Sequence, residues 1–303
     1  GLAALAIALI EIKESGKLTQ GTIKFMATVG EEMEQSGSQQ LFEKGYADDL
    51  DALLIAEPSF PSLVYAHKGS MDFRIKSKGR ASHSSLPFLG QNAIKPLLEF
   101  IQNINQEYEK ITQSVKGESL DFSNMINNLG SQLPNHITKE KAQELIQGLV
   151  MTNSIVQGGT QVNSVPDFAT AEFNVPEYNN NKVKALFNEY IEQANQNGAS
   201  LTQELYLDLE PVVTTGQNRL VELGFDIAKS HFSNERDLIV TPTVAVTDAS
   251  NLLKGKDENF PFLMFGPGNG PHQINECVEK ANYLEFVEYY IEFITSYLNE
   301  ENE

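Results

Sequence analysis

The run Thr22-Ile23-Lys24-Phe25-Met26-Ala27-Thr28-Val29, followed directly by Gly30-Glu31-Glu32, is the stretch around which this chain is organised. The run is mostly apolar, as expected of a buried strand, and two carboxylates follow its end. Desolvating carboxylates is costly unless a positive charge lies against them, and a metal cation is the simplest candidate. Neighbouring side chains point in different directions, so one carboxylate can bind a metal while the other carries a proton. Taken alone, Glu31-Glu32 is more simply explained as a solvated loop edge or the first turn of a helix.

The composition bounds the class of protein. The chain has 303 residues, a hydrophobic fraction of 41% and a formal net charge of -19. This length predicts one large or two ordinary domains, and the charge argues against nucleic acid or an anionic membrane as a partner. No apolar run reaches the length of a membrane span. The single cysteine, Cys277, excludes an internal disulfide and a cysteine-built zinc site, and fits the cytoplasm.

Both ends of the chain show helices alternating with buried strands, which is typical of an α/β layer protein. The expected helices are 1–15, 36–45, 218–232 and 281–298, and the expected strands are 22–29, 52–56, 244–246 and 262–265. Glu57 follows the strand 52–56 as Glu31 and Glu32 follow 22–29. Ligands of open α/β sheets collect at the carboxyl ends of strands, so these acids are expected to converge.

A segment with a different sequence pattern, in which apolar and polar residues alternate along a strand, separates the two ends. Its expected order is strand 71–78, helix 92–109, strands 150–157 and 168–175, helix 181–195 and strand 201–207. This order predicts a ferredoxin-like unit with an antiparallel sheet. The weakly patterned residues 112–148 are expected to form a surface excursion. The predicted division is therefore one domain from 1–66 and 211–303, with 67–210 inserted as a second.

Six motifs occur in one order along the chain. They are Thr28-Val29-Gly30-Glu31-Glu32, Ala56-Glu57-Pro58, Gly79-Arg80-Ala81-Ser82-His83-Ser84-Ser85, Gly158-Gly159 with Asn163-Ser164-Val165-Pro166, Thr247-Asp248-Ala249, and Phe265-Gly266-Pro267-Gly268 through His272. Together they resemble the co-catalytic zinc amidohydrolases, a family that includes succinyl-diaminopimelate desuccinylases, acetylornithine deacetylases and related peptidases. The resemblance implies a three-layer α/β/α catalytic domain, an inserted lid that forms a homodimer, and two Zn²⁺ per subunit, with Co²⁺ or Mn²⁺ as substitutes.

The resemblance also implies a role for each matching residue. Glu31 matches the general base, Glu32 a ligand of one metal, Glu57 a ligand of the other, and His272 the histidine that shares the metal of Glu32. Carboxylate oxygen and imidazole nitrogen are donors that suit zinc. Without the other motifs, His272 would read as an ordinary histidine on a glycine turn.

The remaining matches concern the oxyanion and the substrate. His83 matches a histidine that reaches the active site of the other subunit and helps to stabilise the oxyanion. The substrate-contacting positions are Asn163, Thr247, Asp248 and Gly268. Two of these assignments have plain alternatives: His83 as a strand-end histidine bonded to serines, and Thr247-Asp248 as a helix N-cap. Three other histidines match no family position and are expected to be structural or exposed: His67, His136 and His231.

Two departures from the family pattern stand out. The His-x-Asp motif and the aspartate that bridges both metals would lie upstream of Gly1, so the chain is expected to be incomplete at its N-terminus. Glu32, Glu57 and His272 cannot by themselves hold two metals. An arginine that relatives carry after the strand ending near Val175 is also missing.

The resemblance implies hydrolysis of the amide bond of an N-acyl amino acid, foremost N-succinyl-diaminopimelate to succinate and diaminopimelate in lysine biosynthesis. A dipeptidase or acetylornithine deacetylase on the same scaffold is the alternative within the family. A non-catalytic binding or assembly module is the alternative of another class. A glycosidase using Glu31 and Glu57 is disfavoured by the absence of tryptophan and by His272 with its glycine turn.

Overall fold

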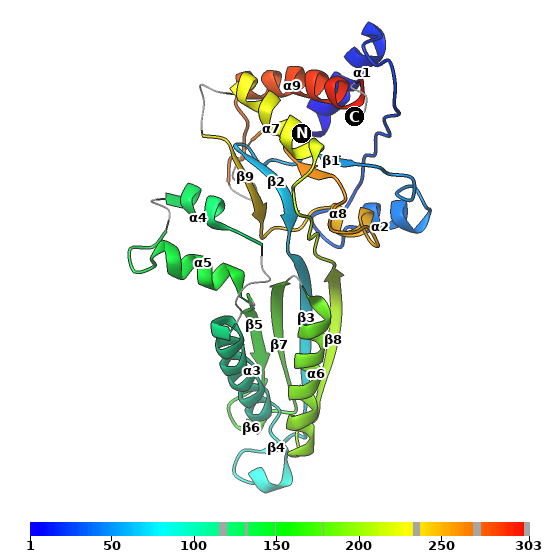
Figure 1. The fold of residues 1–303 in the computed structure, drawn as a ribbon. Coiled ribbons are helices and arrows are strands. Elements are labelled where there is room, and N and C mark those ends of the chain that lie inside the picture. The colour runs from blue at the N-terminus through cyan, green and yellow to red at the C-terminus, as the bar shows by residue number, and fades with distance from the viewer. Residues whose placement is uncertain are drawn as a thin grey trace.

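The computed structural model describes residues 1–114, 120–130, 133–148, 150–177, 179–232, 237–268 and 274–299. The molecule is elongated, with one sheet and its helices at one end and a second sheet with two long helices at the other (Figure 1). The chain passes between the sheets at two neighbouring places. There His67 and Val212 exchange backbone hydrogen bonds of 2.8 and 2.9 Å.

The upper sheet is mixed, with the strand order β1-β10-β2-β9. Its strands are β1 (Leu53–Ile55), β10 (Phe262–Met264), β2 (Ser62–His67) and β9 (Ile239–Thr243). β1 runs parallel to β10 and β2 runs parallel to β9, whereas β10 and β2 are antiparallel. The carboxyl ends of β1 and β10 therefore meet at one edge of the sheet.

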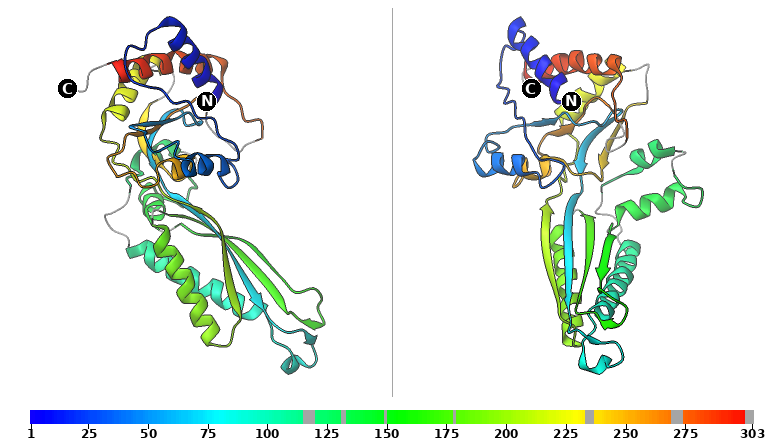
Figure 2. Two further views of the ribbon diagram at one scale, coloured as in Figure 1. Left: turned by 90° about the vertical axis from the view of Figure 1, so that its right-hand side faces the viewer. Right: turned by 180° about the vertical axis from the view of Figure 1, so that it is seen from behind.

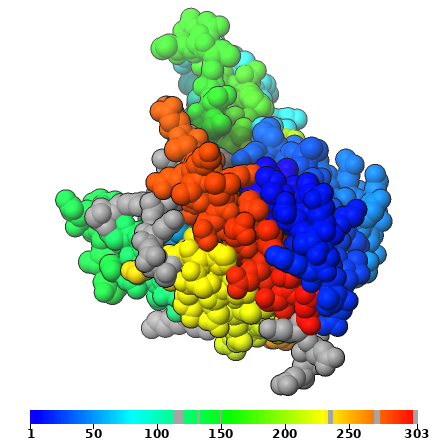
Figure 3. Space-filling model, turned by 90° about the horizontal axis from the view of Figure 1, so that it is seen from above, coloured from blue at the N-terminus to red at the C-terminus, as the bar shows by residue number. Residues whose placement is uncertain are grey.

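Helices cover both faces of this sheet. On one face lie α1 (Leu2–Ser15), α7 (Arg219–Phe232) and α9 (Lys280–Asn299), and on the other lie α2 (Ser36–Glu43) and α8 (Ala249–Leu252). Leu63 packs beneath the first group and the adjacent Val64 beneath the second, because successive strand residues point to opposite faces. Figure 3 shows α1 alongside α9, and α9 alongside α7. The predicted three-layer α/β/α architecture is confirmed.

The lower sheet is antiparallel, with the strand order β5-β7-β3-β8. In chain order its elements are β3 (Gly69–Lys78), α3 (Ile94–Ser114), β5 (Thr152–Gly158), β7 (Phe168–Glu177), α6 (Asn180–Gln196) and β8 (Leu201–Leu209). Both long helices lie on one face, around a core that includes the stacked rings of Phe73 and Phe187, whose centroids are 4.2 Å apart (Figure 2). The ferredoxin-like order is confirmed, and we call this unit the lid.

A short two-stranded antiparallel sheet lies at the far tip of the lid. It pairs β4 (Ser82–His83) with β6 (Ser164–Val165), next to the 3-10 turn η1 (Pro87–Leu89). Figure 1 places this tip at the end of the molecule remote from the upper sheet. None of the helices in the described residues has both the length and the apolar character needed to span a bilayer.

Three sequence predictions differ from the structure. Residues 22–29 do not form a strand, because no strand in the described part of the chain pairs with them. Residues 244–246, expected to form a strand, come just after the strand β9, which ends at Thr243. Val244 is apolar because it packs on a small separate core. That core lies within residues 112–148, expected to be a plain excursion, where α4 (Ser123–Leu129) and α5 (Lys139–Gln147) pack together. The strand β2 was not predicted.

Candidate active site

A tight turn presents Glu31 and Glu32. Gly30 has φ +74°, and its carbonyl accepts a 2.9 Å hydrogen bond from the backbone N–H of Gln35. Gly37, in the first turn of α2, donates its N–H to the carbonyl of Val29 over 3.0 Å, and a Cβ on Gly37 would fall 2.6 Å from that backbone. A glycine at position 37 therefore allows α2 to lie directly against the segment that leads to the two carboxylates.

The loops after β1 and β10 meet as their parallel pairing requires. A Cβ on Gly266 would fall 2.5 Å from the backbone oxygen of Glu57, so these two backbones touch. Gly268, with φ +93°, lies against Pro58 at ordinary contact distance. The predicted ligand His272 follows on the same loop but lies outside the described residues.

One open cavity of about 1430 Å³ collects most of the predicted residues. Its lining includes Glu31, Glu32, Glu57, Thr247 and Asp248, which come from three regions far apart in the sequence. Glu57 is partly buried, Thr247 and Asp248 are buried, and Glu32 is exposed. The expected convergence of acids at the strand ends is therefore observed, although the strand before Glu31 is not.

Glu57 lies in a strongly negative environment. Burial, together with the negative charges of Glu31, Asp248 and Glu32, raises the pKa of Glu57 to about 8. Within the described residues no donor reaches its carboxylate. Asp248 accepts a hydrogen bond from the Thr28 hydroxyl on one oxygen, while its buried Oδ1 has no partner in the described structure. The carboxylates of Glu57 and Asp248 therefore lack a compensating positive charge within the described residues.

Glu31 is oriented by residues that the sequence did not indicate. The side-chain amide of Gln35 donates to Oε1 of Glu31 over 3.0 Å, and Gln35 is fully buried. Asn251 of α8 in turn donates to Oε1 of Gln35 at 3.4 Å and to the Ser38 hydroxyl at 3.1 Å. No motif pointed to Gln35 or Asn251, because their role arises from the packing of α2 against α8.

Thr247 is held by His67. The ring Nδ1 of His67 donates to the carbonyl of Lys68 over 2.7 Å, which leaves Nε2 to accept from the Thr247 hydroxyl over 3.1 Å. Thr247 Oγ1 also accepts from the N–H of Ala249. Burial lowers the pKa of His67 to about 4, although its bond to the Lys68 carbonyl works in the opposite direction. The expectation that His67 is structural agrees with this neutral, buried ring.

His83 and Asn163 lie together at the tip of the lid and not in the cavity. The N–H of Ser84 donates to the carbonyl of Asn163 over 2.9 Å, which ties the two segments of the β4–β6 sheet together. Nδ1 of the exposed His83 accepts from the backbone N–H of Ser85 at 3.3 Å and contacts the Ser85 hydroxyl at 2.7 Å. In the neutral ring the proton therefore resides on Nε2, which can donate a hydrogen bond outward.

The donors around the cavity suit a divalent cation but do not form a complete ligand set. They are carboxylate oxygens, which bind zinc, manganese or magnesium. In the residues that the structure describes, no group of three or more His, Cys, Asp and Glu side chains is arranged to hold a metal ion. Two of the three predicted ligands, Glu32 and Glu57, line the cavity.

Comparison with known proteins places these observations in a family. Residues 65–201 match the model of the peptidase dimerisation domain. The whole chain is 41% identical over 305 aligned positions to a probable succinyl-diaminopimelate desuccinylase of Staphylococcus aureus, covering 99% of this chain and 73% of that protein. A relative of the same name from Staphylococcus epidermidis is 40% identical, with 98% and 73% covered.

Solved structures share the fold. The M20 family metallo-carboxypeptidase Sso-CP2 from Sulfolobus solfataricus superposes with a TM-score of 0.71 at 18% identity, covering 97% of this chain and 74% of that one. At 18% identity this structural likeness shows only that the folds are shared. The Staphylococcus relatives, at 40 to 41% identity, show that the sequences are related as well. The chain therefore belongs to the M20 family of metal-dependent hydrolases, whose members include peptidases and succinyl-diaminopimelate desuccinylases.

Proposed function

We propose that this chain hydrolyses the amide bond of an N-acylated amino acid with the help of divalent metal ions bound in the cavity. The observation that carries the proposal is the gathering of Glu31, Glu32, Glu57 and Asp248 around one open cavity, where burial and the neighbouring acids raise the pKa of Glu57 to about 8. Such a negative cluster is favourable when it faces a cation.

The proposed ligands are Glu32 and Glu57, joined by His272 of the loop after β10. Two zinc ions per subunit would need ligands in addition to these three residues. Co²⁺ or Mn²⁺ could take the place of zinc. When bound, a metal ion of this kind lowers the pKa of a water molecule and polarises the amide carbonyl. Metal-dependent chemistry of this kind is what the M20 family shares.

The protein's own groups would then handle the protons. Glu31, held by Gln35, would accept a proton from water and return it to the leaving nitrogen. His83 of a second copy would donate its Nε2–H to the developing oxyanion, since β4, which carries His83, lies at the tip of the lid remote from the upper sheet (Figure 1). Asn163 of that copy, with Thr247, Asp248 and Gly268, would contact the substrate.

The proposed substrate is N-succinyl-diaminopimelate, because the relatives at 40 to 41% identity carry the name of that desuccinylase. A dipeptide or acetylornithine is the alternative on the same scaffold. The proposed domains are 1–66 with 211–303 for catalysis and 67–210 for the lid and a homodimer. The match of 65–201 to a dimerisation domain supports this division. The cytoplasm is the proposed compartment.

The test is Glu31→Gln in zinc-loaded protein, with N-succinyl-diaminopimelate, N-acetylornithine and a dipeptide as substrates. Turnover is expected to fall by at least about 100-fold with metal content unchanged, because the carboxamide cannot accept the proton. Glu34→Gln, an exposed neighbour, is the matched control. Equal turnover in both variants would remove Glu31 as the base. Wild-type protein that binds no stoichiometric metal and cleaves none of the substrates would favour a binding module.

A further inference from the structure

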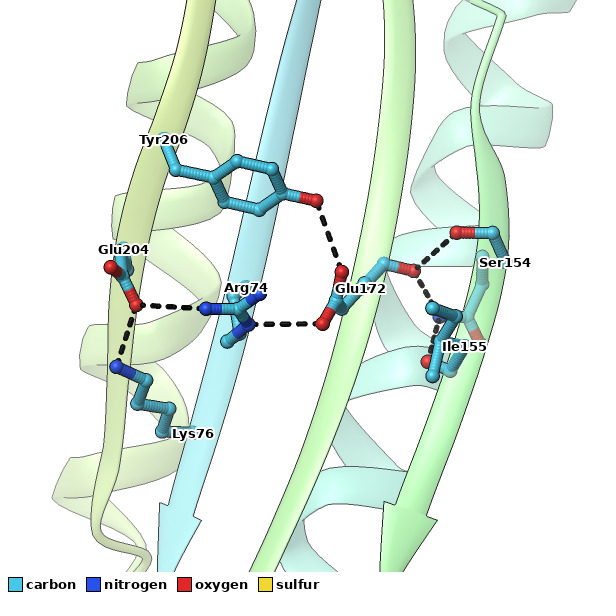
Figure 4. Close-up of polar contacts among 8 residues, drawn as sticks. Arg74, Lys76, Ser154, Ile155, Glu172, Glu204 and Tyr206 are labelled. Atoms are coloured by element: carbon cyan, nitrogen blue, oxygen red, sulfur yellow. Dashed lines mark hydrogen bonds and ion pairs between the residues drawn. The ribbon is translucent and has the colours of Figure 1, made fainter. Parts of the chain in front are cut away.

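The open face of the lid sheet carries a ladder of charged side chains (Figure 4). Arg74 on β3 bonds Glu172 on β7 at 2.9 Å and lies 3.5 Å from Glu204 on β8. Lys76 reaches Glu204 at 2.6 Å, and the Tyr206 hydroxyl donates to Glu172 at 3.0 Å. The two acids of this ladder are thus each paired with a cation.

A third acid, Asp72, lies on the same face one step nearer the upper sheet. No lysine or arginine among the described residues lies within ion-pair distance of it. Asp72 stands directly opposite Asn174 on β7, whose amide donates to Asp72 Oδ1 at 2.7 Å and to the Ser70 hydroxyl at 3.1 Å. In the described structure this amide is the one hydrogen-bond partner of the Asp72 carboxylate.

This trio lines the cavity that also holds Glu57. Ser70, Asp72 and Asn174 belong to its wall, together with the lid residues Pro176 and Leu207. Ser70 is buried and Asp72 and Asn174 are partly buried. The lid thus contributes a carboxylate, a hydroxyl and an amide to a cavity that is also lined by the acids proposed to bind metal.

We propose that Asp72, with Ser70 and positioned by Asn174, is a subsite for a cationic group of the substrate remote from the bond that is cleaved. This inference rests on the proposed function and narrows its substrate class to N-acylated diamino acids. An ammonium group offers three donors and one positive charge, which match the Ser70 hydroxyl and the Asp72 carboxylate, whose charge no described lysine or arginine compensates. An apolar side chain would instead desolvate Asp72 without compensation, so the subsite also rejects monoamino substrates.

The test compares the binding of L-lysine and L-norleucine to zinc-loaded protein by calorimetry. Both amino acids have the same head group and six-carbon chain, so contacts of the head group with metal cancel and only the terminal ammonium differs. Wild-type protein is expected to bind lysine at least about tenfold more tightly, and Asp72→Asn to bind both equally. Asp51→Asn, another cavity-lining carboxylate just before β1, is the control and should keep the preference.

No preference in wild-type protein, or an undiminished preference in Asp72→Asn, would overturn the subsite. A thermal melt of Asp72→Asn shows whether the variant is folded, and Asp72→Glu, which keeps the charge, should restore part of the preference. Hydrolysis of Nα-succinyl-lysine against Nα-succinyl-norleucine is measured in parallel. If neither is cleaved, the proposed function fails, whereas the binding preference still decides the subsite.

Discussion

The side-chain amide of Gln35 donates a 3.0 Å hydrogen bond to the carboxylate of Glu31, four residues before it. Gln35 has φ 52° and is fully buried, so its direction is fixed by the turn and by Asn251 from α8. The orientation of the proposed base therefore depends on a helix more than 200 positions away in the sequence.

Replacing Gln35 by leucine should lower kcat about 10- to 100-fold, because a hydrogen bond to a charged group contributes about 1.5 to 3 kcal/mol. KM should change little, since Glu31 is proposed to act on a proton and not to hold substrate. Gln39→Leu is the control, because Gln39 is exposed and its side-chain amide bonds Glu43 and not Glu31. A folded Gln35→Leu variant with normal kcat would show that the amide does not position the base.

The metal-free protein should become less stable as the pH rises from about 4.5 to about 8. Glu57 keeps its proton to about pH 8 when folded, but loses it near 4.5 when unfolded. The folded state therefore binds more protons in this window, and stability falls with pH by on the order of 5 kcal/mol. Melting with a chelator should show this loss in wild type and less of it in Glu57→Gln. The exposed Glu43→Gln should behave as wild type.

His67 should make the stability of the folded chain rise with pH, the opposite of the effect of Glu57, and at lower pH. Its pKa is about 4 in the folded chain and 6.5 in the unfolded chain. The unfolded state binds the extra proton between these values, so the contribution of His67 is complete above pH 6.5 and is lost toward pH 4. The loss is on the order of 3 kcal/mol. Chemical denaturation of His67→Gln should show a flatter profile there, whereas the exposed His136→Gln should not.

The sequence predicted those parts of the fold that depend on local pattern. Near-continuous apolar runs located β1 and β10, and period-two alternation located β3. The run 22–29 has the same apolar composition but is not a strand. A strand also needs a neighbouring strand to accept and donate its backbone hydrogen bonds, and the pattern of apolar residues does not show whether one is present. The same limit explains Val244, whose apolar character serves a different core.

Motifs in the sequence named most of the acids that line the cavity, whereas their roles stay predictions. Glu31, Glu32, Glu57, Thr247 and Asp248 were all named from the sequence, and all line one cavity. Gln35, Asn251 and Asp72 were not, because a buried amide or a lone acid gives no signal until packing sets its neighbours. The role of His83 stays a prediction, since a single chain keeps it at the far tip of the lid.

That role predicts complementation between two inactive chains. If His83 acts in the cavity of the other subunit, Glu31→Gln and His83→Ala each abolish turnover alone. A mixed dimer restores one cavity, which has Glu31 from one chain and His83 from the other. Random mixing at equal amounts makes about half of the dimers mixed, so activity should return to about a quarter of wild type.

The measurement is the specific activity of the two variants after mixing, unfolding together and refolding. Two copies of the same variant refolded in the same way give the baseline. His83 acting within its own subunit would leave every cavity of the mixed dimer with one defect, and activity would stay at that baseline. The tautomer inferred from the Ser85 N–H bond to Nδ1, with the proton on Nε2, leads to one more prediction. Ser85→Ala should lower kcat by less than His83→Ala does, because it weakens the orientation of the ring without removing its donor.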